Sequence, residues 1–82
     1  MEEFVKELEA LFIKHDLYNV KSINYVYDGR PVYDTYDNKE YQYEECLLIT
    51  FKNYECIVVN VTWDSKQGII KDLMEAITRV LH

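Results

Sequence analysis

Tyrosines and carboxylates are concentrated in residues 25–45, the part of the chain best supplied with side chains that could do chemistry. The segment holds six tyrosines and six acidic residues, against two basic ones. A tyrosine ring offers a large contact area and loses little rotamer entropy on binding. Carboxylates form charge-assisted hydrogen bonds with arginine and lysine. This combination is typical of a surface that receives a basic partner.

From this segment we predict a partner-binding surface in which carboxylates take the place of phosphates and tyrosine rings that of stacked bases. Such a surface would fit a basic groove that normally holds nucleic acid, for example in a nuclease. The alternative is a half-buried sheet edge, where tyrosines pack across strands and acids prevent edge-to-edge association. The two interpretations are compatible. The predicted contact residues are Tyr33, Asp34, Tyr36, Asp37, Glu40, Tyr41, Tyr43, Glu44 and Glu45.

Residue types suited to catalysis or metal binding are sparse. The chain has two histidines, His15 and His82, and two cysteines, Cys46 and Cys56. Their spacing matches no zinc site, and the two glycines form no phosphate-binding loop. A cysteine in an apolar strand is usually a small core residue. We therefore expect no catalytic residue, no cofactor and no metal.

The charge of the chain narrows the choice of partner. Nine basic and fifteen acidic residues give a net charge of −6. Binding to DNA, RNA or an anionic membrane depends on lysine and arginine, so none of these is expected. A basic protein surface is the expected partner, because a negative field steers it toward the chain. The simpler interpretation is that the charge keeps a small protein soluble.

Length and composition indicate one domain over residues 1–82. No apolar run is long enough to cross a membrane. The first residues, Met1, Glu2 and Glu3, lack the basic and apolar segments of a signal peptide. We therefore expect a cytoplasmic location, which would be the host cytoplasm if a phage encodes the chain.

Hydrophobic periodicity predicts the elements of the first half of the chain. Residues 2–16 have helical spacing, and residues 20–27 alternate like a strand. Asp28-Gly29 is typical of a two-residue hairpin turn, after which residues 32–36 could form the returning strand. Asp37-Asn38 predicts another turn.

The strongest predicted strands are residues 43–52 and 55–63, joined by a short loop. Both are apolar on both faces, which indicates a central hairpin covered on each side. A short loop would place Cys46 and Cys56 on opposite faces, so we expect no disulfide between them. Trp63 is expected to anchor the core beneath the last helix, with a role in recognition as the alternative.

Asp64 and Ser65 are expected to cap a final helix that runs to about Leu81. The predicted fold is α+β: an antiparallel sheet of three or four strands flanked by an N-terminal and a C-terminal helix, in the order α-β-β-(β)-β-α. Two helices on one face would leave the second face of the sheet uncovered. Either the helices divide between the faces or a partner covers the second one, and a homodimer is the simplest such partner.

No motif identifies a family, but the chain as a whole resembles two classes of small proteins. In size, acidity, element order and a composition rich in the amino acids that AT-rich codons encode (Phe, Tyr, Met, Ile, Asn and Lys), it is similar to inhibitors that phages carry against bacterial defence systems, including anti-CRISPR proteins that mimic DNA. It also resembles small immunity proteins that neutralise bacterial toxins. The resemblance implies a protein-binding inhibitor rather than an enzyme. A homodimeric structural or regulatory domain whose acidity is incidental remains the third hypothesis.

Overall fold

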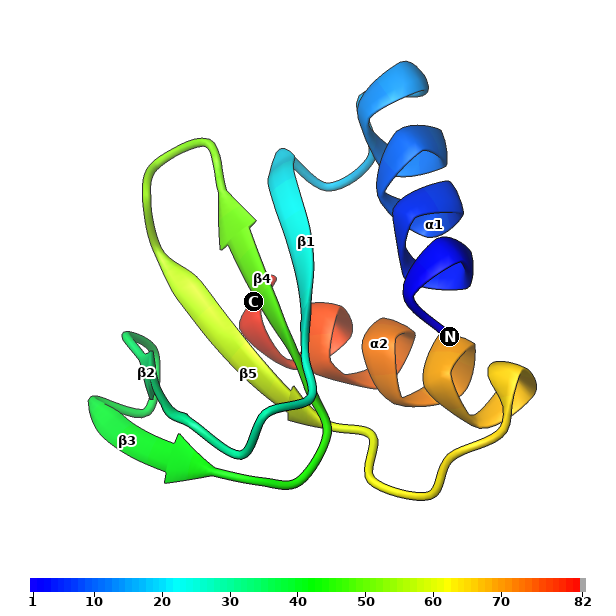
Figure 1. Ribbon diagram of the computed structural model, residues 1–82. Coiled ribbons are helices and arrows are strands. Elements are labelled where there is room, and N and C mark those ends of the chain that lie inside the picture. Colours follow the sequence, from blue (N-terminus) through cyan, green and yellow to red (C-terminus); the bar gives the residue numbers. More distant parts are fainter. Residues whose placement is uncertain (82) are drawn as a thin grey trace.

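The computed structural model describes residues 1–81, which form two helices, a three-stranded sheet and a two-stranded arm (Figure 1). The predicted α+β fold is confirmed: in sequence order, the strands of an antiparallel sheet follow an N-terminal helix and precede a C-terminal helix. Over the described range, neither helix combines the length and apolar character needed to span a bilayer. The elements are α1 (Glu2–Lys14), β1 (Val20–Val26), β2 (Pro31–Asp34), β3 (Lys39–Gln42), β4 (Cys46–Phe51), β5 (Cys56–Asn60) and α2 (Lys66–Val80).

The sheet has the order β1-β4-β5, with every neighbouring pair antiparallel, so β4 is the central strand. Ile23, Ile49 and Ile57 lie side by side across the three strands and point to one face. Both helices cover this face: α1 contributes Val5 and α2 contributes Leu73 to the same core. The apolar faces predicted for the two helices therefore pack into one shared core.

The second face of the sheet is covered by the chain itself, through an arm that consists of β2, β3 and the turn between them. Val32 of β2 packs with Val26, Cys46 and Val58 of the sheet in a second apolar cluster. Figure 1 shows the arm beside β5, away from the helices. The expectation that this face is uncovered was wrong, because the segment after β1 folds over it.

The predicted hairpin between residues 20–27 and 32–36 was also wrong. β1 pairs with β4, with Val26 opposite Cys46, and β2 pairs with β3 instead. Two physical reasons favour this arrangement. Pro31 has no N–H to give to a ladder with β1, whereas the apolar strand β4 gives β1 a partner that buries aliphatic side chains. The turn predicted at Asp37-Asn38 is present and joins β2 to β3.

The arm is attached to the free edge of β5 by side-chain hydrogen bonds. The N–H of Val58 donates to Asp34 Oδ2 at 3.0 Å, and the N–H of Cys56 donates to Thr35 Oγ1 at 2.7 Å. The other oxygen of Asp34 accepts from the N–H of Asp37 at 2.8 Å, and Asp34 is fully buried. These bonds occupy donors that would otherwise leave the edge open to another strand. Asp34 is therefore part of the fold, and its prediction as a partner contact was wrong.

Replacing Asp34 should destabilise the protein because it leaves the buried N–H of Val58 and the partly buried N–H of Asp37 without an acceptor. Asp34→Ala is expected to lower the free energy of unfolding by about 3 kcal/mol, since hydrogen bonds to a charged group contribute about 1.5–3 kcal/mol each. Urea denaturation followed by circular dichroism measures the effect. Glu40→Ala, which removes an exposed acid from the same arm, should change stability by no more than about 0.5 kcal/mol. Equal losses in the two variants would contradict this role of Asp34.

Candidate functional site

The nine predicted contact residues do not share one surface. On the arm, Tyr33 and Glu40 lie opposite each other and are exposed. Tyr36, in the turn of the arm, packs edge-on against Phe51, with ring centroids 6.1 Å apart. Tyr33 and Glu40 therefore face solvent, whereas Tyr36 is exposed but its ring also contacts the sheet.

The inner side of the arm holds Tyr41 and Tyr43, whose rings stack with centroids 5.6 Å apart against the second apolar cluster. The hydroxyl of Tyr41 donates to Asp37 Oδ2 at 2.7 Å, and this bond raises the pKa of Tyr41 to about 12. The same bond, together with Arg79 at 3.2 Å, lowers the pKa of Asp37. Asp37 is thus paired within the chain, and these side chains hold the arm in place.

Glu44 and Glu45 lie elsewhere, at the end of the sheet where β1 finishes, β4 begins and β5 finishes (Figure 1). The start of α1 and the loop before α2 lie at the same end, toward the bottom and right of the view. This end gathers acids and aromatic rings from four separate parts of the chain. We call it the acidic–aromatic end, and its members are Glu2, Tyr25, Tyr27, Asp28, Glu44, Glu45, Trp63 and Asp64.

Hydrogen bonds connect the parts of the acidic–aromatic end. The hydroxyl of Tyr25 donates to the carboxylate of Glu45; burial, followed by this bond, raises the pKa of Tyr25 to about 12. The ring of Tyr25 stacks on that of Tyr27, with centroids 5.0 Å apart. A hydrogen bond to Glu2 raises the pKa of Tyr27 in turn. Both phenols therefore stay neutral at physiological pH, and they tie the start of α1 to the sheet.

An open depression of about 560 Å³ lies between the stacked tyrosines and the acids Asp28, Glu44 and Glu45. Asp28 is occupied by Arg30: its Oδ1 accepts from the backbone N–H of Arg30 at 3.2 Å and lies 3.9 Å from Arg30 Nε. No ion pair within residues 1–81 involves Glu44 or Glu45. The depression therefore offers acceptor oxygens and ring faces, which are the groups that bind a guanidinium or ammonium ion.

Trp63 is at the surface, and the prediction that it anchors the core was wrong. Its side chain is 87% exposed, while Val61 takes the buried position at the end of β5. The chain then turns, with the N–H of Asp64 donating to the carbonyl of Val61 at 3.0 Å. Trp63 has φ 63°, a left-handed conformation that costs a non-glycine residue about 1–2 kcal/mol. An exposed tryptophan gains no packing energy in return, and exposed tryptophans are enriched among residues that dominate binding energy.

Asp64 adds negative charge beside Glu45. Ser65 is the N-cap of α2, its Oγ accepting from the N–H of Gly68 at 3.1 Å. The carboxyl carbon of Asp64 lies 3.3 Å from where a Cβ on Gly68 would sit, so glycine gives Asp64 room along the first turn. A hydrogen bond with Asp72, then burial, raises the pKa of Asp64. The buried Oδ2 of Asp64 has no hydrogen-bond partner within residues 1–81, and two carboxylates held close together repel each other when both are ionised.

The remaining candidates for chemistry do not contribute to the exposed surface of this end: Cys46 follows Glu45 but is buried. Cys46 and Cys56 are both free thiols. They lie on the same face, contrary to the prediction, because the register places Cys56 opposite Thr50. Each is the first residue of its strand, and because β4 and β5 are antiparallel the two thiols lie at opposite ends of the pair and cannot bridge. His15 is the C-cap of α1. Within the described part of the chain, no three His, Cys, Asp or Glu side chains are grouped so as to hold a metal.

Comparison of the chain with protein-family models, with curated protein sequences and with solved structures gave no match.

Two parts of the acidic–aromatic end were missed by sequence reasoning. Tyr25, Tyr27 and Asp28 belong to the tyrosine-rich segment but were assigned to a hairpin and left out of the contact surface. The signal for Trp63 was its position directly before the capping pair Asp64-Ser65, which places it in the connection to the helix. A residue in a connection is free to face solvent.

Trp63 should be dispensable for folding if it is kept for binding. Trp63→Gly is expected to be as stable as the natural protein, because glycine adopts a positive φ without strain. Trp63→Ala keeps the strain and should be less stable than Trp63→Gly by about 1 kcal/mol. Thermal unfolding of the three proteins measures the difference. Loss of the folded state in Trp63→Gly would instead show that the indole supports the fold.

The pair Asp64 and Asp72 should make stability depend on pH. Because the folded-state pKa of Asp64 is raised, its stabilising contribution is complete below its unfolded pKa of about 3.9 and is lost as pH rises through the folded-state pKa. Asp72→Asn should therefore raise the melting temperature at pH 7 and have little effect at pH 3. Glu75→Gln removes an equal charge from an exposed position of α2 and is the control. Equal melting temperatures for the two variants at pH 7 would rule out the repulsion.

Proposed function

We propose that this protein is an inhibitor that binds a basic surface of another protein through its acidic–aromatic end. The main support is the gathering of carboxylates at one end of the sheet beside exposed aromatic rings. Glu44 and Glu45 have no ion pair within residues 1–81, and Tyr27 and Trp63 are 58% and 87% exposed. This combination of unpaired negative charge and exposed rings suits a cationic counterpart.

The proposed target surface is a groove that normally holds nucleic acid. Carboxylates spaced along the acidic–aromatic end would accept hydrogen bonds from the arginines and lysines that otherwise contact phosphates. Tyr27 and Trp63 would lie against the side chains on which bases stack. The net charge of −6 would speed the encounter with such a groove. Occupation of the groove would then exclude the nucleic acid.

This mode of action fits a phage-encoded inhibitor of a host defence nuclease, in the manner of anti-CRISPR proteins. An immunity protein that blocks a nuclease toxin would use the same surface, and the identity of the target distinguishes the two. The case for a homodimer rested on an uncovered sheet face. The arm covers that face through Val32 and Tyr41, so a monomeric inhibitor is the form we propose.

The proposal predicts binding to a nucleic-acid-binding nuclease that depends on charge at one end of the molecule. A panel of RNA-guided nuclease complexes and nuclease toxins can be assayed by biolayer interferometry. For the nuclease that binds, its affinity for this protein should fall steeply as the salt concentration is raised, and DNA or guide RNA should compete with this protein for the groove. Glu44→Lys should weaken binding at least tenfold, because it reverses an exposed charge at the proposed contact.

The matched control is Glu75→Lys, which changes the net charge by the same amount on the exposed side of α2. It should retain most of the affinity. Equal losses in Glu44→Lys and Glu75→Lys would mean that only the total charge matters. Binding that is insensitive to salt and to competing nucleic acid would refute the proposed mode of action.

A further inference from the structure

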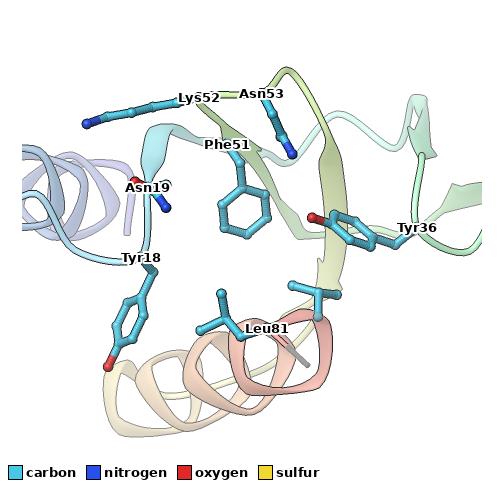
Figure 2. A pocket seen from close by; sticks show the side chains of 8 residues that line it. Tyr18, Asn19, Tyr36, Phe51, Lys52, Asn53 and Leu81 are labelled. Carbon is cyan, nitrogen blue, oxygen red and sulfur yellow. The ribbon is translucent and has the colours of Figure 1, made fainter.

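A cavity of about 270 Å³ lies at the opposite end of the sheet from the acidic–aromatic end (Figure 2). The loop after α1, the turn between β4 and β5, the turn of the arm and the last turn of α2 enclose it. It shares no residue with the acidic–aromatic end, and the inference drawn from it is independent of the proposed function.

The floor and walls of the cavity are apolar or aromatic. Phe51, at the end of β4, is only 4% exposed and forms the floor. Figure 2 shows its ring between Tyr18 and Tyr36, which stand on opposite sides of the opening. Tyr36 meets Phe51 edge-on, at an interplanar angle of 81°. Val80 of α2 completes the apolar lining.

Hydrogen-bonding groups stand at the rim. Asn53 Oδ1 accepts from the N–H of Glu55 at 3.0 Å, which leaves the amide NH₂ of Asn53 to donate elsewhere. Within residues 1–81, no hydrogen bond involves the side-chain amide of Asn19 or the hydroxyl of Tyr36. In Figure 2 the Asn53 side chain and the Tyr36 hydroxyl both point toward the opening. These groups could hold one polar edge of a ligand.

Among the described residues that line the cavity, none presents an unpaired charge to it. Lys52 is the charged residue in the lining, but its side chain points away from the opening and pairs with Asp16 (Figure 2). An ionic ligand would therefore find no counter-charge among the lining residues in the range 1–81, in a protein that already has a net charge of −6. The lining is suited to an uncharged molecule.

The rim is held in place before any ligand arrives. The N–H of Lys52 donates to the carbonyl of Asn19 at 2.8 Å, and the N–H of Val20 donates to the carbonyl of Leu17 at 3.1 Å. Tyr18 and Asn19 both have positive φ, 54° and 58°. A loop fixed by hydrogen bonds has less ordering entropy to lose on binding. The cavity thus has the features of a ligand site: an apolar floor, a few convergent polar groups and a preformed shape.

We propose that this cavity binds a neutral aromatic ligand of one or two rings that carries an amide or hydroxyl group on its edge. The ring lies on Phe51 between the two tyrosines. The polar edge meets Asn19, Asn53 and the hydroxyl of Tyr36.

The test is a ¹H–¹⁵N NMR titration of the full chain with benzamide, with benzoate as the charged counterpart. Benzamide should give saturable shifts at the backbone amides of Asn19, Lys52 and Asn53, with a Kd of about 1 mM for a ligand of this size. Benzoate should bind at least tenfold more weakly. Absence of saturable shifts at these amides, or equal binding of benzoate, would overturn the proposal.

Variants locate the site. Val80→Trp fills the cavity and should weaken benzamide at least tenfold, while Tyr54→Ala, which removes an exposed ring from the neighbouring turn, should not. If Val80→Trp disturbs the rest of the spectrum, Tyr36→Ala replaces it as the informative variant, with at least a fivefold loss expected. Affinity for benzamide that is unchanged in the folded cavity variant would mean that the ligand binds elsewhere, and the proposal would be withdrawn.

Discussion

The outward N–H groups of β5 are the constraint on which the arrangement of this molecule depends. An edge strand with free donors invites association, and a buried donor without a partner costs free energy. Asp34 and Thr35 satisfy the N–H groups of Val58 and Cys56 from within the chain. This attachment holds the arm over the second face of the sheet, where Val32 closes the smaller apolar cluster. A domain with a thin core gains a covered second face without a partner.

The attachment of the arm to β5 also determines where the carboxylates of Glu44 and Glu45 lie. The arm lies beside β5, and after β3 the chain runs back from there to the start of β4. On this path it passes Tyr43 and places Glu44 and Glu45 beside the end of β1. There they join Tyr25, Tyr27 and Asp28, which precede the arm in the sequence. The tyrosine-rich segment is thereby divided: its middle part supports the fold, and its two ends meet at the acidic–aromatic end.

The acidic–aromatic end contains features that lower the stability of the folded state. Asp64 and Asp72 repel each other unless they share a proton, and Trp63 has a left-handed backbone with an exposed side chain. Natural proteins tend to depart from local rules at sites of function, where binding compensates for what stability loses. The exposed aromatic area beside carboxylates that have no ion pair is the physical reason for assigning the proposed contact to this end.

The sequence predicted the elements well because their signals are local. The apolar runs of β4 and β5, the helical spacing of α1 and α2, and the cap at Ser65 all agree with the structure. Pairing was less predictable: Asp28-Gly29 is a strong turn signal, yet β1 pairs with β4, because long-range burial outweighed local turn preference. The burial of Asp34 depends on the edge of β5, 24 residues away, and composition cannot reveal it. Trp63 was misassigned by extending a strand through a residue that turns.

The central claim is that cationic partners meet this protein at the acidic–aromatic end rather than wherever acids occur. A ¹H–¹⁵N NMR titration with a nona-arginine peptide at low salt tests it without knowledge of the natural target. The account predicts that the largest shifts fall on Tyr27, Asp28, Glu44, Glu45 and the Trp63 indole N–H. Shifts distributed evenly over all exposed acids, with Glu7 and Glu75 affected as strongly as Glu44, would contradict it.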